Sequence, residues 1–518
     1  MLKNLIRGGQ TNIHQVRMFK QIVWVGFLVS LGVSLGVGFY SQRIPLWVWK
    51  KWIYGKFLLE SSPYLDHRIY KELMRVWKTI FPVFWMSYGV LWILWVIKGY
   101  FTRKDTHIRG SAFVSLRRLR FIMRRRGLIS PLRLDKLPLV KDKETSHILI
   151  TGTTGSGKTN CLHKLIPQII NQKGIIVDLT GDFVHRYYDP TRDHILNPFD
   201  ERSKHWSPWR DMNHPTHYDA FAKSIVPSSN KTDPFWDQAS RTLLATALEK
   251  TKTLPEFLKI LLSSNIKTLE KFFKGTRAAN IVSADSEKTT ASILSNLSTH
   301  LASFVYLKEG GFSIREWVKK ESKGFLFLTA TPDQRETLRP LITAWVESVL
   351  NSLMSLPPNH KRRFWIIMDE LPALNKLSSL TTALSESRKY GGCLVAGIQS
   401  VQQLEDIYGY NLAASLLDNF NTKIFFRAMN PDTAKWISRV LGSYEQKEVN
   451  ENVSYGANTM RDGVNLSDQI RTHPLVREEE IMQLKDLEAY IKLPEGLPVT
   501  KVKMGVERGQ KSLQKNSQ

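Results

Sequence analysis

A glycine-rich segment carries the clearest chemistry in this chain of 518 residues. It reads Gly152, Thr153, Thr154, Gly155, Ser156, Gly157, Lys158, Thr159, and it follows a short apolar run at 147–150 that is typical of a buried strand. In such a G-x-x-x-x-G-K-[ST] segment the backbone N–H groups turn toward phosphates, and the lysine reaches the outer phosphates. The hydroxyl of Thr159 can ligate Mg²⁺. The segment therefore predicts a nucleoside triphosphate site with Mg²⁺.

A second acidic element is needed to hold the metal and to activate water. The apolar run 364–368 is followed by Asp369 and Glu370. We expect Asp369 to hold Mg²⁺ directly or through water, and Glu370 to act as the general base. An acidic pair after an apolar run can also be a solvated strand end, but the phosphate loop in the same chain favours the catalytic interpretation.

Two short motifs raise the alternative of a GTPase. Asp178 to Gly181 matches D-x-x-G, and Asn230 to Asp233 matches N-K-x-D. The first comes only 20 residues after Lys158, at the end of the apolar run 174–177, which leaves little room for a switch segment. No clear apolar strand delivers Asn230. The sequence therefore favours ATP over GTP.

The elements that position these residues alternate between strand-like and helical patterns. Strand-like runs lie at 174–178, 324–329, 364–368, 393–398 and 423–427. This alternation predicts an α/β fold with a parallel sheet covered on both faces. Helical spacing dominates 206–310, with runs at 239–248, 254–262, 266–273 and 289–304, and predicts an inserted all-α domain. The nucleotide-binding domain would comprise 106–205 plus 311–505, and 506–518 would be a disordered tail.

Two uncharged runs precede this body, at 22–42 and 79–97, and each is long enough to cross a membrane as a helix. We therefore expect a membrane domain at 1–105. Net charges of +4 for 1–20, +5 for 43–78 and +9 for 98–126 flank the runs. Because the loop 43–78 is also positive, the arginines at 117–126 and the ATP site together predict that both termini are cytoplasmic. We expect the arginine cluster to contact anionic lipid.

Composition excludes several other classes of protein. The hydrophobic fraction of 42% is too high for a disordered chain, and 518 residues exceed one compact domain. The formal charge of +26 would favour a nucleic-acid binder, but most of the excess flanks the two apolar runs. Cys161 and Cys393 lie far apart in apolar contexts, so we expect reduced structural thiols and neither a disulfide framework nor a cysteine metal site.

The order of these pieces resembles the coupling proteins of type IV secretion systems, in particular the TraD-like branch of conjugative elements. The resemblance is carried by Glu144 and His147 before the phosphate loop, Asp178 to Asp182, Ile195 to Asp200, Asp233 to Trp236 with Arg241, Asp369 to Pro372, Ser387 to Gly392, Gly397 to Ser400, Ser454 to Gly456 and Arg461 to Val464. It implies a RecA-like P-loop sheet with an inserted all-α domain, preceded by two transmembrane helices.

The family implies an inner-membrane, DNA-dependent ATPase of conjugation that assembles as a homo-hexamer. Its partners would be DNA bound without sequence preference, relaxase and relaxosome proteins, and components of the secretion channel. By resemblance, Lys158 and Thr159 are the Walker A pair, and Asp369 and Glu370 the Walker B pair. Arg388 resembles the arginine supplied to a neighbour's nucleotide, and Gln399 resembles the glutamine that senses the γ-phosphate.

The position of Arg388 supports its role independently. It precedes the apolar strand 394–398, whereas Gln399 follows that strand, so the two should emerge at opposite ends of the sheet. Arg388 could then reach only a neighbour's nucleotide. Arg427, at the end of another apolar run, is a second candidate. A surface role for Arg388 and an ordinary strand-end role for Gln399 remain open alternatives.

The chain departs from the family in two respects. Thr180 stands where many members have lysine, so a second cation there is in doubt. No long acidic tail follows the core, so relaxosome docking of that kind is uncertain. An alternative function is a receptor ATPase that recruits protein effectors to the channel. A septal DNA pump, which usually has four spans and a winged-helix end, fits less well.

Overall fold

The computed structural model describes residues 106–227, 234–282, 287–454 and 463–507, together with scattered positions between 20 and 93. The chain divides into two compact units. One comprises 1–109 and 444–473, and the other comprises 110–443 and 474–518. The second unit contains the phosphate loop.

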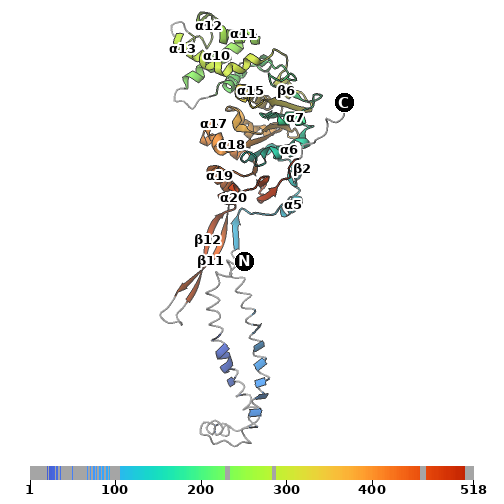
Figure 1. The fold of residues 1–518 in the computed structure, drawn as a ribbon, viewed down its shortest axis with the longest axis vertical. Coiled ribbons are helices and arrows are strands. Elements are labelled where there is room, and N and C mark those ends of the chain that lie inside the picture. The colour runs from blue at the N-terminus through green and yellow to red at the C-terminus, as the bar shows by residue number, and fades with distance from the viewer. Residues whose placement is uncertain are drawn as a thin grey trace. The chain divides into compact units, whose positions relative to one another are not determined.

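A nine-stranded sheet organises the second unit (Figure 1). Its strands, in spatial order, are β14 (Thr500–Lys503), β13 (Glu488–Lys492), β10 (Thr422–Phe425), β4 (Ile148–Thr151), β9 (Gly392–Ile398), β8 (Phe364–Met368), β5 (Lys173–Asp178), β7 (Gly324–Thr329) and β6 (His194–Leu196). The strands from β10 to β6 pair in parallel, and β13 and β14 add an antiparallel edge. The predicted α/β fold with a parallel sheet is confirmed.

Both faces of this sheet are buried, which explains the continuous apolar runs of its strands. In β4 the side chains of Ile148 and Ile150 enter one core, while Leu149 enters the core on the opposite face. The alternation follows from the two-residue period of a strand. The two cores fix the strand register, so they also fix the positions of the loops at the strand ends.

Different helices cover the two faces (Figure 1). On the side of Ile148 lie α5 (Leu116–Arg125), α6 (Lys158–Ile169) and α7 (Asp182–Tyr187). On the side of Leu149 lie α15 (Arg335–Met354), α16 (Leu380–Glu386), α17 (Val401–Tyr408) and α18 (Tyr410–Asp418). A third core joins α19 (Pro431–Leu441) and α20 (Glu478–Met482) to the antiparallel edge. The sheet is therefore covered as the sequence predicts.

The segment between β6 and β7 is mainly helical. It contains α8 (Pro208–Asp211), α9 (Pro215–Ile225), α10 (Phe235–Lys250), α11 (Leu254–Leu258), α12 (Ile266–Phe273), α13 (Glu287–Leu301) and α14 (Ile314–Lys319). The predicted helical runs are thus present, and a π-helical turn at Lys259–Ser263 extends α11. Trp206 packs on Trp345 of α15 with ring centroids 5.9 Å apart, so one core runs from the helices into the sheet unit.

Two small β structures lie outside the large sheet. One is the hairpin of β2 (Ile129–Leu134) and β3 (Leu137–Val140), which packs beside α6. The other is a three-stranded sheet, in the order β1 (Thr106–Gly110), β11 (Ser443–Ser454) and β12 (Gly463–Pro474). Residues 444–473 were predicted as part of the nucleotide-binding domain, whereas they fall in the first compact unit. Their mostly polar sequences carry no apolar run that would indicate strands.

The predicted spans 22–42 and 79–97 lie largely outside the described residues. Within the described positions no helix has both the length and the apolar character that crossing a membrane requires. Most of the predicted tail, from 508 onward, is also outside the described residues, while Glu507 pairs with Lys164 of α6 at 2.9 Å.

The two cysteines are free and buried, as the sequence predicts. Burial raises the pKa of Cys161 to about 12 and raises the pKa of Cys393 as well.

Candidate nucleotide-binding site

The phosphate loop connects β4 to α6, with β9 and β10 on either side of β4. Its glycines are required by close contacts. A Cβ atom on Gly152 would lie 2.6 Å from Ser156 Oγ and 2.7 Å from Phe426 Cβ. Gly157 has φ +122°, and a Cβ atom at this position would lie 2.9 Å from the Phe426 ring. Phe426, which follows β10, therefore packs against the phosphate loop at both glycines.

Lys158 is the first residue of α6 and only 8% exposed. Its Nζ donates to the carbonyl oxygen of Gly152 at 2.6 Å and to that of Thr153 at 3.3 Å. Burial lowers the pKa of Lys158, while the nearby Glu370 and Asp369 raise it. The structure thus brings the Walker A lysine and both predicted acids into one site.

The acidic pair follows β8, as predicted. The Thr159 hydroxyl donates to Asp369 Oδ2 at 3.0 Å. The other oxygen of Asp369, Oδ1, and Glu370 Oε1 are buried and have no hydrogen-bond partner among the described residues. Burial raises the pKa of both carboxyls, and the hydrogen bond from Thr159 opposes this for Asp369. A hydroxyl and carboxylate oxygens directed into one site fit the ligand preference of Mg²⁺.

Gln399 follows β9 and connects the two motifs. Its Nε2 donates to Glu370 Oε2 at 2.8 Å, and its Oε1 accepts from the Thr154 hydroxyl at 3.3 Å. The hydrogen bond from Gln399 lowers the pKa of Glu370, whereas burial raises it. The strands carrying Gln399 and Glu370 approach closely at Gly397, where a Cβ would lie 1.9 Å from the Asp369 carbonyl oxygen. The Gln399 side chain therefore contacts both Glu370 and the phosphate loop.

Arg388 lies at the other end of β9, in the 3₁₀ turn η6 (Ser387–Tyr390). It is exposed, and among the described residues its side chain makes no hydrogen bond or ion pair. Residues 389–398 separate it from Gln399, and seven of them form β9. At about 3.3 Å per residue this is about 20 Å, so Arg388 cannot reach the phosphate loop of its own subunit.

Arg427, the second arginine candidate, follows β10 beside its own phosphate loop. Its carbonyl oxygen accepts from the Thr153 amide at 2.8 Å and from the Thr153 hydroxyl at 3.2 Å. Its guanidinium pairs with Asp486 at 2.9 Å. Arg427 therefore supports the loop through its backbone, and its side chain is engaged within the subunit.

The D-x-x-G segment forms a closed turn at the end of β5. Asp178 is fully buried, and its Oδ1 accepts from the Gly181 amide at 2.8 Å and from the Thr180 amide and hydroxyl. Its Oδ2 accepts from the Val184 amide at 2.8 Å. These bonds satisfy both carboxylate oxygens, and Thr180 is part of the turn. This turn accounts for the D-x-x-G sequence, so no GTPase switch is needed to explain it. The second GTPase-like motif, Asn230 to Asp233, lies outside the described residues.

Arg335 was not singled out from the sequence. It begins α15, after the carboxyl end of β7, and donates to the carbonyl oxygen of Leu179 at 2.9 Å. Its charge lowers the pKa of Glu370. A basic residue following a strand of the parallel sheet was the available signal, but Arg335 precedes the acidic pair by 34 positions along the chain.

The arginine cluster near 117–126 lies on α5 and forms part of a cavity of about 370 Å³. The cavity is lined by basic and apolar side chains: Arg117, Arg120, Phe121, Arg124, Ile129, Arg133, Lys136 and Pro138. No acidic residue is among them, and Phe121 is 66% exposed. We call this surface the α5 basic groove.

Comparison with known proteins connects this geometry to one family. Residues 131–505 match the family model of the type IV secretion-system coupling protein DNA-binding domain. The chain is 30% identical to the coupling protein TraD of Escherichia coli K12, over 97% of this chain and 77% of TraD. A shorter match, 29% identical over 34% of this chain and 26% of the relative, is to VirD4 of Agrobacterium fabrum.

Solved structures agree with the sequence matches. The plasmid coupling protein TrwB in complex with ADP and Mg²⁺ superposes with a TM-score of 0.69, at 31% identity over 78% of this chain and 96% of TrwB. TrwB in complex with a non-hydrolysable ATP analogue gives the same TM-score at 30% identity, over 79% of this chain and 96% of TrwB. The shared sheet, the phosphate loop and these matches lead to one conclusion: the chain belongs to the type IV secretion-system coupling protein family.

Proposed function

We propose that this chain is a coupling ATPase of the bacterial inner membrane, which links the relaxosome to a type IV secretion channel and translocates DNA in conjugation. The observation that carries the proposal is the convergence of Lys158, Thr159, Asp369, Glu370 and Gln399 at the carboxyl edge of one parallel sheet. Its similarity to TraD and to nucleotide-bound TrwB supports it.

Each residue of the site has a distinct task in hydrolysis. Lys158 exchanges its loop carbonyl partners for phosphate oxygens. The amides of Gly152 and Thr153 are bonded to neighbouring strands, so the phosphates are surrounded by amides from the later part of the loop, up to Thr159. Thr159 and Asp369 would hold Mg²⁺, which neutralises charge on the phosphate oxygens. Glu370 accepts a proton from the attacking water, and its raised pKa brings its basicity closer to that required at neutral pH. Gln399 orients Glu370 through the 2.8 Å hydrogen bond.

Arg388 completes the site of a neighbouring subunit in this proposal. It is exposed, and the length of β9 keeps it away from its own site. A guanidinium supplied in trans stabilises the charge of the transferring phosphoryl group and makes hydrolysis conditional on assembly. We propose a homo-hexamer as the active state, with DNA in a central channel bound through its phosphates and without sequence preference.

The membrane anchor is a further part of the proposal. The uncharged runs 22–42 and 79–97 are proposed to span the inner membrane, with both termini and the ATPase in the cytoplasm. The α5 basic groove has basic side chains and no acidic lining residue, so it is suited to anionic lipid headgroups. We propose that 206–310 functions as an inserted all-α domain, which shares a core with the sheet.

The test is phosphate release by the purified full chain in lipid nanodiscs, with and without single- or double-stranded DNA. We expect DNA to stimulate hydrolysis by the wild type, and Lys158→Ala to be inactive in both conditions. A rate of phosphate release that neither single- nor double-stranded DNA changes would contradict DNA translocation. Co-purification with Glu370→Gln, which retains nucleotide, is expected to recover relaxase and DNA; recovery of effector proteins alone would instead indicate a protein-recruiting receptor.

A further inference from the structure

The strand that leads into the phosphate loop begins from an unusual backbone conformation. His147 directly precedes β4 and has φ +61° and ψ 152°. This region is populated almost exclusively by glycine, and other residues persist there only where the surrounding structure holds them. The His147 side chain is 1% exposed. A strained, buried histidine at this position therefore requires an explanation from its contacts.

The His147 ring makes two hydrogen bonds to backbone groups. Its Nδ1 accepts from the Leu394 amide at 3.2 Å, so the proton lies on Nε2, which donates to the carbonyl oxygen of Leu384 at 3.0 Å. A protonated ring could not accept the first bond. Burial lowers the pKa of His147 to about 4, and the charge of Arg388 lowers it further against the hydrogen bond to Leu384. The ring is therefore neutral at physiological pH.

These two partners lie on either side of Arg388. Leu384 belongs to α16 and Leu394 to β9, and the segment between them contains the 3₁₀ turn with Arg388. A single ring thus holds both ends of the segment that carries the arginine. Arg362 holds the middle of this segment, because its Nη1 donates to the carbonyl oxygen of Tyr390 at 3.2 Å.

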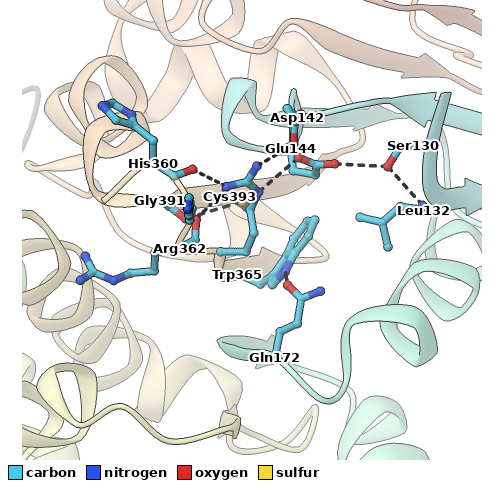
Figure 2. Close-up of polar contacts among 12 residues, drawn as sticks. Ser130, Leu132, Asp142, Glu144, Gln172, His360, Arg362, Trp365, Gly391 and Cys393 are labelled. Carbon is cyan, nitrogen blue, oxygen red and sulfur yellow. Dashed lines mark hydrogen bonds and ion pairs between the residues drawn. The ribbon is translucent and has the colours of Figure 1, made fainter. Parts of the chain in front are cut away.

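The turn before His147 is itself anchored. Figure 2 shows Glu144, in the 3₁₀ turn η1 (Glu144–Ser146), bonded on one side to Ser130 and on the other to a guanidinium. The guanidinium is that of Arg363, whose Nε lies 3.2 Å from Glu144 Oε2, and the Ser130 hydroxyl donates to Glu144 Oε1 at 3.3 Å. Arg363 directly precedes β8. The backbone conformation of His147 is therefore fixed by contacts from the hairpin and from the sheet.

We infer that His147 is a positioning residue for Arg388. It fixes the arginine-bearing segment so that the guanidinium of one subunit meets the nucleotide of the next. The inference rests on the proposed role of Arg388 in trans. It predicts that a change at His147 harms hydrolysis in the neighbouring subunit, while nucleotide binding in the altered subunit is preserved.

His147→Asn is the informative variant. The asparagine oxygen can replace Nδ1 as the acceptor for Leu394, whereas the bond to Leu384 is lost. We expect kcat to fall about 10- to 100-fold, as small displacements of a reacting group do, with the KM for ATP and the Kd for a non-hydrolysable ATP analogue unchanged. Arg362→Ala, at a half-buried position, should lower kcat in the same way. In an Arg388→Ala background, His147→Asn should cause no further loss.

Mixed assemblies separate positioning from a local effect on the phosphate loop. Lys158→Ala subunits retain an intact arginine segment, so mixing them with His147→Asn subunits should raise hydrolysis above the mean of the two variants. Mixing with Arg388→Ala subunits serves as the reference. If the reference mixture recovers activity and the His147→Asn mixture does not, His147 acts on its own loop and the inference is overturned.

If the reference mixture also fails to recover, the proposed role of Arg388 is refuted instead. Thermal unfolding of each variant shows whether it is folded. Should His147→Asn be unfolded, the same mixtures with Arg362→Ala decide the question, because failure of Arg362→Ala to be complemented would remove the positioning argument.

Discussion

Subunits that lack Arg388 should be rescued by subunits that lack Lys158. Arg388→Ala removes the guanidinium proposed to act in trans, and we expect kcat to fall about 10³- to 10⁵-fold in assemblies of this variant alone. Lys158→Ala removes the phosphate contacts of its own site but leaves Arg388 intact. Each variant is inactive for a different reason, so an interface between the two can be complete.

The structure sets the size of the expected recovery. The seven residues of β9 place Arg388 about 20 Å from Gln399, so the donor and the acceptor of the guanidinium must be different copies. In randomly mixed equimolar assemblies, half of the acceptor sites retain Lys158, and half of the neighbours of these retain Arg388. About a quarter of the interfaces then carry both groups, whatever the number of subunits in the ring.

The assay is steady-state phosphate release at constant total protein, after subunits have been allowed to exchange. We expect about a quarter of wild-type activity if the interfaces act independently. Lys389→Ala, at the adjacent exposed position, is the matched control and should stay close to wild type alone. Activity of the mixture that never exceeds the mean of the two parent variants would refute the trans role.

Three further outcomes follow from the site. Lys158→Ala should abolish binding of a fluorescent ATP analogue, whereas Glu370→Gln should bind it and not hydrolyse it; equal loss of binding in both would contradict the assigned roles. Gln399→Ala removes a bond that lowers the pKa of Glu370, a pKa already raised by burial above its ordinary 4.5. Because the base must be deprotonated, the acid limb of the kcat profile should move to higher pH, and an unmoved limb would count against Glu370 as the base. Gly397→Ala places a Cβ against the Asp369 carbonyl oxygen and should lower the free energy of unfolding by about 1–3 kcal/mol, measured by denaturant titration; an unchanged midpoint would show that the strands can separate.

The sequence predicted the parts of the fold that depend on local pattern. The strands that lie between buried faces are continuous apolar runs, so β5, β7 and β8 could be placed within a residue or two. The phosphate loop and the acidic pair could be placed together because parallel strands bring their carboxyl ends to one edge. The position of Arg388 followed from the same rule, since it precedes β9 and Gln399 follows it.

What escaped prediction depends on contacts between distant segments. β11 and β12 are polar and are recognised only when paired with each other. The backbone strain at His147 and its bonds to Leu384 and Leu394 have no local sequence signal, although His147 could be noted as part of the family resemblance. Arg427 was correctly placed near a strand end, but its pairing with Asp486 required the fold.

The deep burial of Cys161 and Cys393 has a practical consequence. Both thiols are 0% exposed, and burial keeps them protonated at neutral pH, so neither reacts readily with maleimide. A cysteine introduced on the surface could carry a fluorophore without first removing the native pair. Energy transfer between two such labelled populations would then report the rate of subunit exchange between assemblies.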